Sequence, residues 1–241
     1  MEKWNVEMVT NRGLVREINE DAAVIIDDVL IVADGMGGYS AGEVASRLLV
    51  EAVTRALPPV PDAEKGTERL TAAIAAANES ILEESKAHAD YSGMGTTVVL
   101  LEHAGDSLYW AHVGDSRLYR LRDGQLRRIT RDHSLVADLV EQGSITEAEA
   151  RVHPKRNLLT RAVGVEEKVV PETGRLSSRK GDIYLLCSDG LTNMIDDERI
   201  RDVLLTKENG KAAALCELAL EAGGQDNITV ITAEVNEAHA S

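Results

Sequence analysis

Four aspartates stand where an apolar, strand-like run meets a loop, each beside glycine or asparagine. They occur in the segments Val-Ala-Asp34-Gly35, Val-Gly114-Asp115, Cys-Ser-Asp189-Gly190 and Gln-Asp226-Asn227. The end of a strand holds a side chain in a fixed position, and glycine lets the backbone approach a bound group closely. Together with Asn19-Glu20-Asp21 near the N-terminus, these segments predict a carboxylate cluster. Clustered carboxylates repel each other unless cations neutralise them, and hard oxygen ligands suit Mg²⁺ or Mn²⁺.

A second interpretation of the same residues is local turn formation. Asp-Gly is a common turn dipeptide, and a chain with 41 acidic residues contains several such pairs by composition alone. Asp123-Gly124 lies between two strand-like runs and predicts only a hairpin turn. For any one of the other four aspartates, taken singly, both interpretations remain open.

Composition predicts one folded domain over residues 1–241. No Pro-, Gly- or Ser-rich linker divides the chain, and the sequence shows no internal repeat. The hydrophobic fraction of 44% is ample for a core. Because aromatic residues make up only 3% and Phe is absent, that core must consist of Val, Leu, Ile and Ala.

Charge and cysteine content restrict the partners and the compartment. The net charge of −15 repels nucleic acid and bare anionic membranes. No apolar run is long enough to cross a bilayer, and the N-terminus has no apolar signal segment. Cys187 and Cys216 lie in apolar contexts, which is typical of a reducing cytoplasm. We therefore expect a cytoplasmic protein, and a monomer because no apolar stripe demands a dimer.

The order of expected elements predicts the fold class. Strands are expected at 8–10, 23–26, 29–33, 96–101, 107–113, 117–121, 183–187 and 228–235. Helices are expected at 40–57, 67–88, 134–142, 146–151, 199–205 and 211–221, the first with Ser40 as N-cap. The strands from 96 to 121 are expected to form an antiparallel meander. Runs of strands and pairs of helices predict an α+β fold with antiparallel sheets.

Six motifs in register resemble the metal-dependent protein phosphatase family, the protein phosphatase 2C type. They are Gly13-Leu-Val-Arg16-Glu-Ile-Asn19-Glu20-Asp21, Asp34-Gly35-Met-Gly37-Gly38, Gly93-Met-Gly95-Thr96-Thr97, Gly114-Asp115-Ser116-Arg117, Ser188-Asp189-Gly190 and Asp226-Asn227-Ile-Thr. The likeness covers about residues 4 to 235 and is greatest to the compact bacterial members. It implies a four-layer αββα sandwich of two antiparallel β-sheets flanked by helix pairs, with metals at one end.

The resemblance also implies roles for individual residues. Two essential Mn²⁺ or Mg²⁺ ions would be bridged by Asp34, and Gly35 would give its carbonyl to one of them. The expected ligands of the ions or of their waters are otherwise Glu20, Asp21, Asp189 and Asp226, and Asp115 would hold a third, looser ion. Arg16 resembles the residue that grips the substrate phosphate, for which a planar fork of donors is well suited.

The chain departs from the family pattern at two points. Met36 stands where many eukaryotic members have a histidine that is thought to protonate the leaving group, and a thioether cannot do so. A metal-bound water or His153 is then the candidate proton donor, although an exposed loop histidine is the simpler interpretation of His153. Asn193 stands where some relatives place another acid near the third metal. Residues 133–168 resemble the flap of bacterial relatives, expected to act as a lid or substrate gate.

These observations predict metal-dependent hydrolysis of phosphoserine and phosphothreonine in proteins by a water bridging two ions. The expected partners are phosphorylated proteins, including a bacterial Ser/Thr kinase. A non-catalytic binding module of the same fold is the alternative, and it would be marked by loss of metal acids, which are all present. A related regulator that acts on an anti-sigma-factor antagonist would share the mechanism. A cysteine phosphatase is excluded because neither Cys187 nor Cys216 is followed six positions later by Arg.

Overall fold

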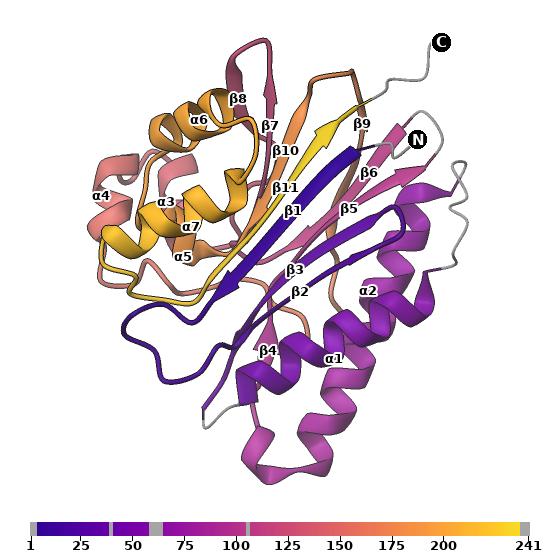
Figure 1. Cartoon of the computed structure of the whole chain (residues 1–241). Coiled ribbons are helices and arrows are strands. Elements are labelled where there is room, and N and C mark those ends of the chain that lie inside the picture. Colours follow the sequence, from indigo (N-terminus) through magenta and orange to yellow (C-terminus); the bar gives the residue numbers. More distant parts are fainter. Residues whose placement is uncertain (1–3, 39–40, 58–64, 105–106, 237–241) are drawn as a thin grey trace.

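Two antiparallel sheets pack face to face and carry helices on both outer faces (Figure 1). The computed structural model describes residues 4–38, 41–57, 65–104 and 107–236. The first sheet has the strand order β1-β11-β10-β7-β8 and the second β2-β3-β5-β6-β9, with β4 paired to β3. The strands are β1 Trp4–Asn11, β2 Asp21–Ile26, β3 Val29–Met36, β4 Gly95–Thr96, β5 Val98–Ala104, β6 Ser107–Val113, β7 Arg117–Arg122, β8 Gln125–Arg128, β9 Glu172–Ser177, β10 Ile183–Cys187 and β11 Ile228–Val235.

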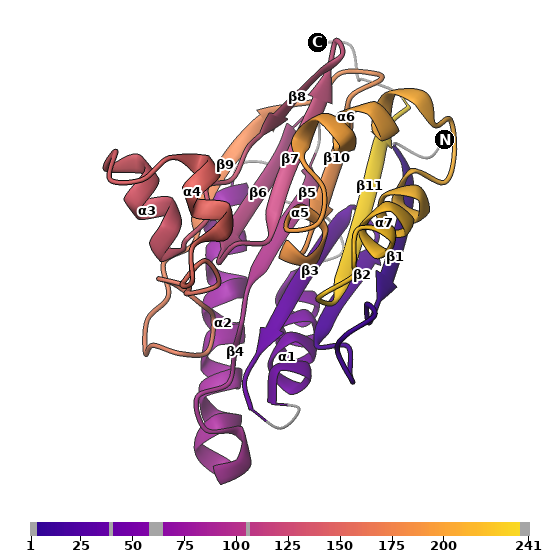
Figure 2. The same ribbon diagram turned by 90° about the vertical axis from the view of Figure 1, so that its left-hand side faces the viewer.

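The helices form an outer layer on each side of this sandwich. They are α1 Ala41–Ala56, α2 Gly66–Ala87, the short 3₁₀ helix Ala89–Tyr91, α3 Leu135–Glu141, α4 Glu147–Val152, α5 Asp189–Thr192, α6 Asp197–Thr206 and α7 Lys211–Glu221. α1 and α2 cover the second sheet, and α6 and α7 cover the first. α3 and α4 protrude to one side of the sandwich (Figure 2). The fold is therefore the expected α+β sandwich of two antiparallel sheets flanked by helix pairs.

Three apolar layers hold these elements together. One lies between α1–α2 and the second sheet, one between the two sheets, and one between the first sheet and α5–α7. In α1 the buried positions Ala41, Ala45, Leu49 and Val53 recur every four residues and give the helix one apolar face. All five residues of β10 are buried because this strand lies inside a sheet covered on both faces.

One expectation about connectivity is wrong. Residues 96–121 do not form a single meander, because β5 and β6 pair in the second sheet whereas β7 pairs with β10 and β8 in the first. The chain changes sheet at Gly114, whose φ of +107° is open to glycine but strained for other residues. A strand has the same kind of sequence whichever sheet it joins, so the sequence does not mark the change of sheet between β6 and β7.

Other local expectations fare better. Asp123 and Gly124 have φ values of +51° and +74° and form the predicted hairpin turn between β7 and β8. The pattern missed β9, which is the edge strand of its sheet and has no buried residue. It also missed α5, a helix of only four residues. Ser40, the expected N-cap, lies outside the described residues.

Candidate active site

Five acidic segments come together at one end of the sandwich. β1 pairs with β11 from Trp4↔Val235 at the far end to Asn11↔Ile228 at this end. Asp226 lies two residues before β11, and Asp189 begins α5 directly after β10. Asp21 and Asp34 are register partners on β2 and β3. With Glu20 and Asp115, which follows β6, these four form the group that we call the acidic site.

The pKa values of the carboxylates in the acidic site are raised by burial and by their neighbouring charges. Burial raises the pKa of Asp34 well above its ordinary value, and the neighbouring charges of Asp21, Asp189, Asp115 and Asp226 raise it further. Burial likewise raises the pKa of Asp21 to about 7 and that of Asp189 to about 6. The structure therefore gathers acids whose charged forms are stabilised only if cations join them.

The backbone of Asp34 is fixed by two threonines. Its N–H donates to Thr97 Oγ1 at 2.9 Å, and its carbonyl accepts from the Thr97 N–H at 2.9 Å. The same carbonyl accepts from Thr96 Oγ1 at 2.9 Å. Thr97 Oγ1 also lies 2.7 Å from Ser116 Oγ, next to Asp115. Thr97 thus ties two acidic segments together, a role that sequence reasoning did not identify, although Gly-Thr-Thr was among the motifs.

Gly35 and Gly42 allow the start of α1 to approach the acids. The Gly35 N–H donates to the Glu20 carbonyl at 3.1 Å. A Cβ added at Gly35 would lie 2.0 Å from the Gly42 carbonyl oxygen, and one added at Gly42 would lie 2.5 Å from Glu20 Oε1. A side chain at either position would force the backbones apart. Gly42 was missed because a glycine inside a helical pattern gives no specific signal.

Arg16 lies at the rim of the acidic site. Its Nη2 donates to Asp226 Oδ2 at 2.8 Å, and its Nη1 is 4.0 Å from Glu20 Oε2. The Arg16 side chain is 46% exposed, so the guanidinium can be reached from solvent. A bidentate donor beside a group of acids can bind an anion that cations have drawn to the same place.

Asn227 anchors the loop that carries Arg16. Its Nδ2 donates to the carbonyls of Arg12 and Ile18, each at 2.9 Å, and its Oδ1 accepts from the Glu20 N–H at 2.8 Å. One buried amide side chain therefore fixes both ends of this loop beside Asp226. Its position after Asp226 placed it in a motif, but the motif alone did not reveal this bracing role.

The remaining oxygen atoms of the site fit a hard divalent cation. Ser188 Oγ donates to Asp21 Oδ2 at 2.8 Å, whereas Asp21 Oδ1 is buried and has no hydrogen-bond partner among the described residues. Asn193 Nδ2 donates to Asp189 Oδ2 at 2.9 Å. Buried carboxylate oxygens that lack a hydrogen-bond partner are the kind of ligand that Mg²⁺ and Mn²⁺ prefer. The raised pKa values of the neighbouring acids indicate the same need for a cation.

Other candidate residues lie apart from this site. His153 ends α4, where its Nδ1 accepts from the Lys155 N–H at 3.1 Å. None of its described contacts joins it to the acids. Cys187 and Cys216 are buried free thiols in the apolar layer under α5–α7, and burial raises the pKa of both, that of Cys187 to about 12. Both are core residues, as expected.

The fold and the site together define a four-layer α+β protein with a carboxylate cluster suited to divalent cations. Residues 17–217 match the family model described as Protein phosphatase 2C. This match covers most of the chain, and the chain therefore belongs to the protein phosphatase 2C family, as the motifs predicted. Among the described residues, no helix has both the length and the apolar character that a bilayer crossing requires.

Individual relatives agree with this assignment. The chain is 44% identical over 230 residues to the serine/threonine protein phosphatase PstP of Mycobacterium tuberculosis, with 94% of this chain and 44% of that protein covered. It thus spans less than half the length of this relative. It is 39% identical to the serine/threonine phosphatase stp of Listeria welshimeri, with 96% of each covered. A crystal structure of the PstP catalytic domain in complex with two manganese ions matches with a TM-score of 0.90 and 41% identity, covering 97% of this chain and 99% of that one.

Proposed function

We propose that this chain hydrolyses phosphoserine and phosphothreonine in proteins with the help of two Mn²⁺ or Mg²⁺ ions. The observation that carries the proposal is the meeting of six acidic side chains at one end of the sandwich, where the pKa values of Asp34, Asp115, Asp21 and Asp189 are all raised. The two manganese ions of the related PstP catalytic domain support the choice of metal.

Within this proposal each acid has a role. Asp34 would serve both ions, and the Gly35 carbonyl would be a ligand of one of them. Asp189 and Asp226 would be ligands of the other, while Glu20 and Asp21 would hold metal or its waters. Asp115 would hold a third, looser ion. When bound, the two ions would lower the pKa of a shared water and direct it at phosphorus.

Arg16 binds the substrate phosphate. In the structure its guanidinium pairs with Asp226 at 2.8 Å, and a cation on Asp226 would compete for that carboxylate. The freed fork of N–H donors can then bind two phosphate oxygens at once. Met36, the last residue of β3, cannot donate a proton, so the leaving oxygen must take its proton from elsewhere.

The substrates that we propose are phosphorylated proteins, including a bacterial Ser/Thr kinase. The insert over 133–168, with α3 and α4, is proposed as the flap that gates peptide substrates. If so, replacing it should change rates on phosphopeptides far more than rates on an aryl phosphate. The buried free thiols Cys187 and Cys216 suit a reducing cytoplasm, which we propose as the compartment of this protein.

The proposal is tested by phosphate release from an aryl phosphate and from phosphopeptides after metal stripping and addition of Mn²⁺. Asp34→Ala or Asp189→Ala should lower turnover by about 1,000-fold or more, a barrier change of about 4 kcal/mol. Both should also lose Mn²⁺ binding in calorimetry. Arg16→Ala should chiefly raise KM while keeping Mn²⁺ binding. The matched control is Asp123→Asn, in the hairpin turn, which should keep wild-type rates.

The same assay separates the enzyme from a non-catalytic binding module. A module would bind phosphopeptide yet release no phosphate with any divalent cation. Near-normal turnover in both Asp34→Ala and Asp189→Ala would refute the assignment of the site.

A further inference from the structure

Two buried histidines and a glutamate lie close together at the base of the 133–168 insert. Ligand-type atoms of His112, His133 and Glu172 all lie within 4.8 Å of one another. Glu172 Oε2 is 3.9 Å from His112 Nδ1 and 3.8 Å from His133 Nε2. The two imidazole rings lie 4.7 Å apart, centroid to centroid. Such a trio can either bind a cation or form part of a hydrogen-bond network.

The hydrogen bond at His133 Nδ1 decides between these possibilities. The Gly114 N–H donates to Nδ1 at 3.1 Å. Burial, with smaller effects from His112 and Arg161, lowers the pKa of His133 to about 4, so the ring is neutral and holds one proton. Since Nδ1 accepts, that proton lies on Nε2, which then has no lone pair for a metal. Only His112 and Glu172 remain, fewer than the three protein ligands of typical metal sites.

His133 instead holds the backbone of Gly114 at two points. Besides the Nδ1 bond, the His133 N–H donates to the Gly114 carbonyl at 2.7 Å. Gly114 directly precedes Asp115 and has a φ of +107°. A Cβ added at Gly114 would lie 2.6 Å from Thr97 Cγ2. This position must be glycine, which has the most backbone freedom, so external partners are needed to fix it.

The same residue is tied to the returning end of the insert. The His133 carbonyl accepts from the Thr160 N–H at 2.9 Å. The next residue, Ser134, forms a bridge with Leu159. His133 therefore joins the base of the insert to the loop that carries Asp115.

From these contacts we infer that His133 is a positioning residue, whose Nδ1 fixes Gly114 and thereby the direction of the Asp115 carboxylate. This inference rests on the proposed function, in which Asp115 holds the looser ion. Its consequence is that loss of the Nδ1 acceptor weakens that ion selectively. The ions on Asp34 and Asp189 should be unaffected.

A matched pair of variants tests the inference. In His133→Asn the amide oxygen can occupy the place of Nδ1 and keep the acceptor, whereas in His133→Gln the amide reaches the place of Nε2. Calorimetric titration of metal-stripped protein with Mn²⁺ should show the weakest site about 10-fold weaker in His133→Gln. In His133→Asn it should stay within about 3-fold of wild type. The tighter sites should match wild type in both.

Amide hydrogen exchange of Gly114, followed by NMR in metal-free protein, gives a readout that needs no metal. The Gly114 N–H should be protected in wild type and in His133→Asn, and should exchange faster in His133→Gln. Equal weakening of the Mn²⁺ site in both variants would overturn the inference, because the ring would then act by packing or as a ligand. An unprotected Gly114 N–H in wild type would also overturn it, even if His133→Gln does not fold. A wild-type protein that binds no Mn²⁺ would refute the proposed function alone, and the exchange rates would still decide whether His133 holds Gly114.

Discussion

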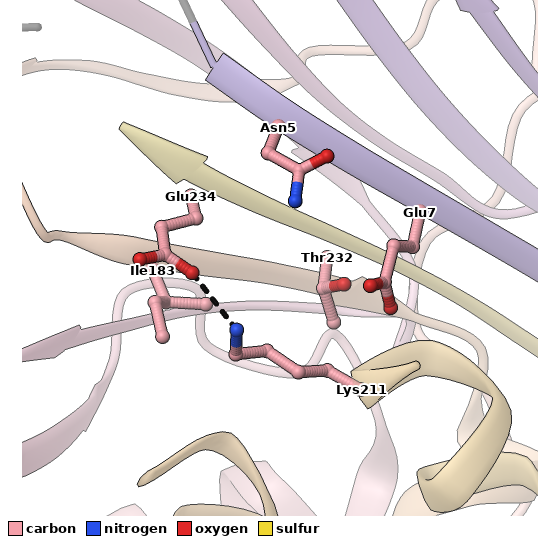
Figure 3. A pocket seen from close by; sticks show the side chains of 6 residues that line it. All are labelled: Asn5, Glu7, Ile183, Lys211, Thr232 and Glu234. Atoms are coloured by element: carbon pink, nitrogen blue, oxygen red, sulfur yellow. Dashed lines mark hydrogen bonds and ion pairs between the residues drawn. The ribbon is translucent and has the colours of Figure 1, made fainter. Parts of the chain in front are cut away.

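Two groups of acidic side chains in this molecule differ in what neutralises them. In the first group, Glu7 of β1 and Glu234 of β11 face α7 (Figure 3). Glu7 accepts from the Gly210 and Ala212 N–H groups, at 2.7 and 3.1 Å, at the start of this helix. Glu234 accepts from Lys211 Nζ at 2.8 Å. Each charge there meets a donor of opposite sign or a helix N-terminus, which favours anions.

The acidic site is built in the opposite way. Arg16 pairs with Asp226 and lies near Glu20, but it reaches the site only from the rim. The charges that raise the pKa of Asp34 belong to four other aspartates. The comparison shows that acids paired with a cation or with N–H donors stabilise the fold. Acids that are surrounded by other acids reduce its stability until a cation binds.

The largest expected difference between the two groups of acids is in how Mn²⁺ stabilises the folded protein. Mn²⁺ at 100 times its dissociation constant should add about 2.7 kcal/mol to the unfolding free energy of wild-type protein. For a chain of this size that corresponds to a rise in Tm of roughly 5–11 °C. Asp34→Asn should remove this rise, whereas Glu234→Gln should keep it. Thermal melts with EDTA and with Mn²⁺ measure both. A Mn²⁺ response that survives in Asp34→Asn would contradict the comparison.

A smaller effect is the pH dependence of the metal-free protein. Burial raises the folded-state pKa of Asp21 to about 7 and that of Asp189 to about 6, against an ordinary pKa of 3.8. Between pH 4 and pH 7 the folded protein therefore binds more protons than the unfolded chain, so this contribution to stability is lost as pH rises through that window. In EDTA we expect Tm to fall from pH 5 to pH 8. Asp34→Asn should flatten the fall, because it removes a buried carboxyl group whose own pKa is raised in the folded state. An equal slope in variant and wild type would show that the cluster does not cause it.

Sequence reasoning predicted that these acidic segments gather, because four aspartates stood at strand ends and six motifs kept their order. It did not predict what holds them. Thr97, Gly42 and Asn227 act through backbone groups of segments far away in the chain, and no local pattern marks such contacts. The roles assigned to the acids and to Arg16 remain predictions until metal and phosphate are bound.

The same limit explains the error in strand connectivity. The segments that form β6 and β7 both look like strands in sequence and are separated by a short turn, which is typical of a hairpin. The pairing of β6 with β5 and of β7 with β10 shows that the chain crosses between sheets at Gly114, which packs against Thr97 and makes two hydrogen bonds with His133. A glycine that looked like a turn residue is thus a point where the fold and the acidic site depend on each other.

The smallest expected effect tests the matched group. Glu7→Ala removes an acceptor for two N–H groups at the start of α7 and should lower the unfolding free energy by about 1 kcal/mol, a loss in Tm of roughly 2–4 °C. Glu7→Gln keeps one acceptor oxygen and should cost less, which separates hydrogen bonding from charge. Neither variant should change Mn²⁺ affinity or turnover, because the Glu7 carboxylate binds the Gly210 and Ala212 N–H groups at the start of α7 and not residues of the acidic site. Thermal melts, with calorimetry as the control, measure the pair. A Glu7→Ala protein with weakened Mn²⁺ binding would show that the two groups of acids are coupled through the sheet, and their contrast would then have to be abandoned.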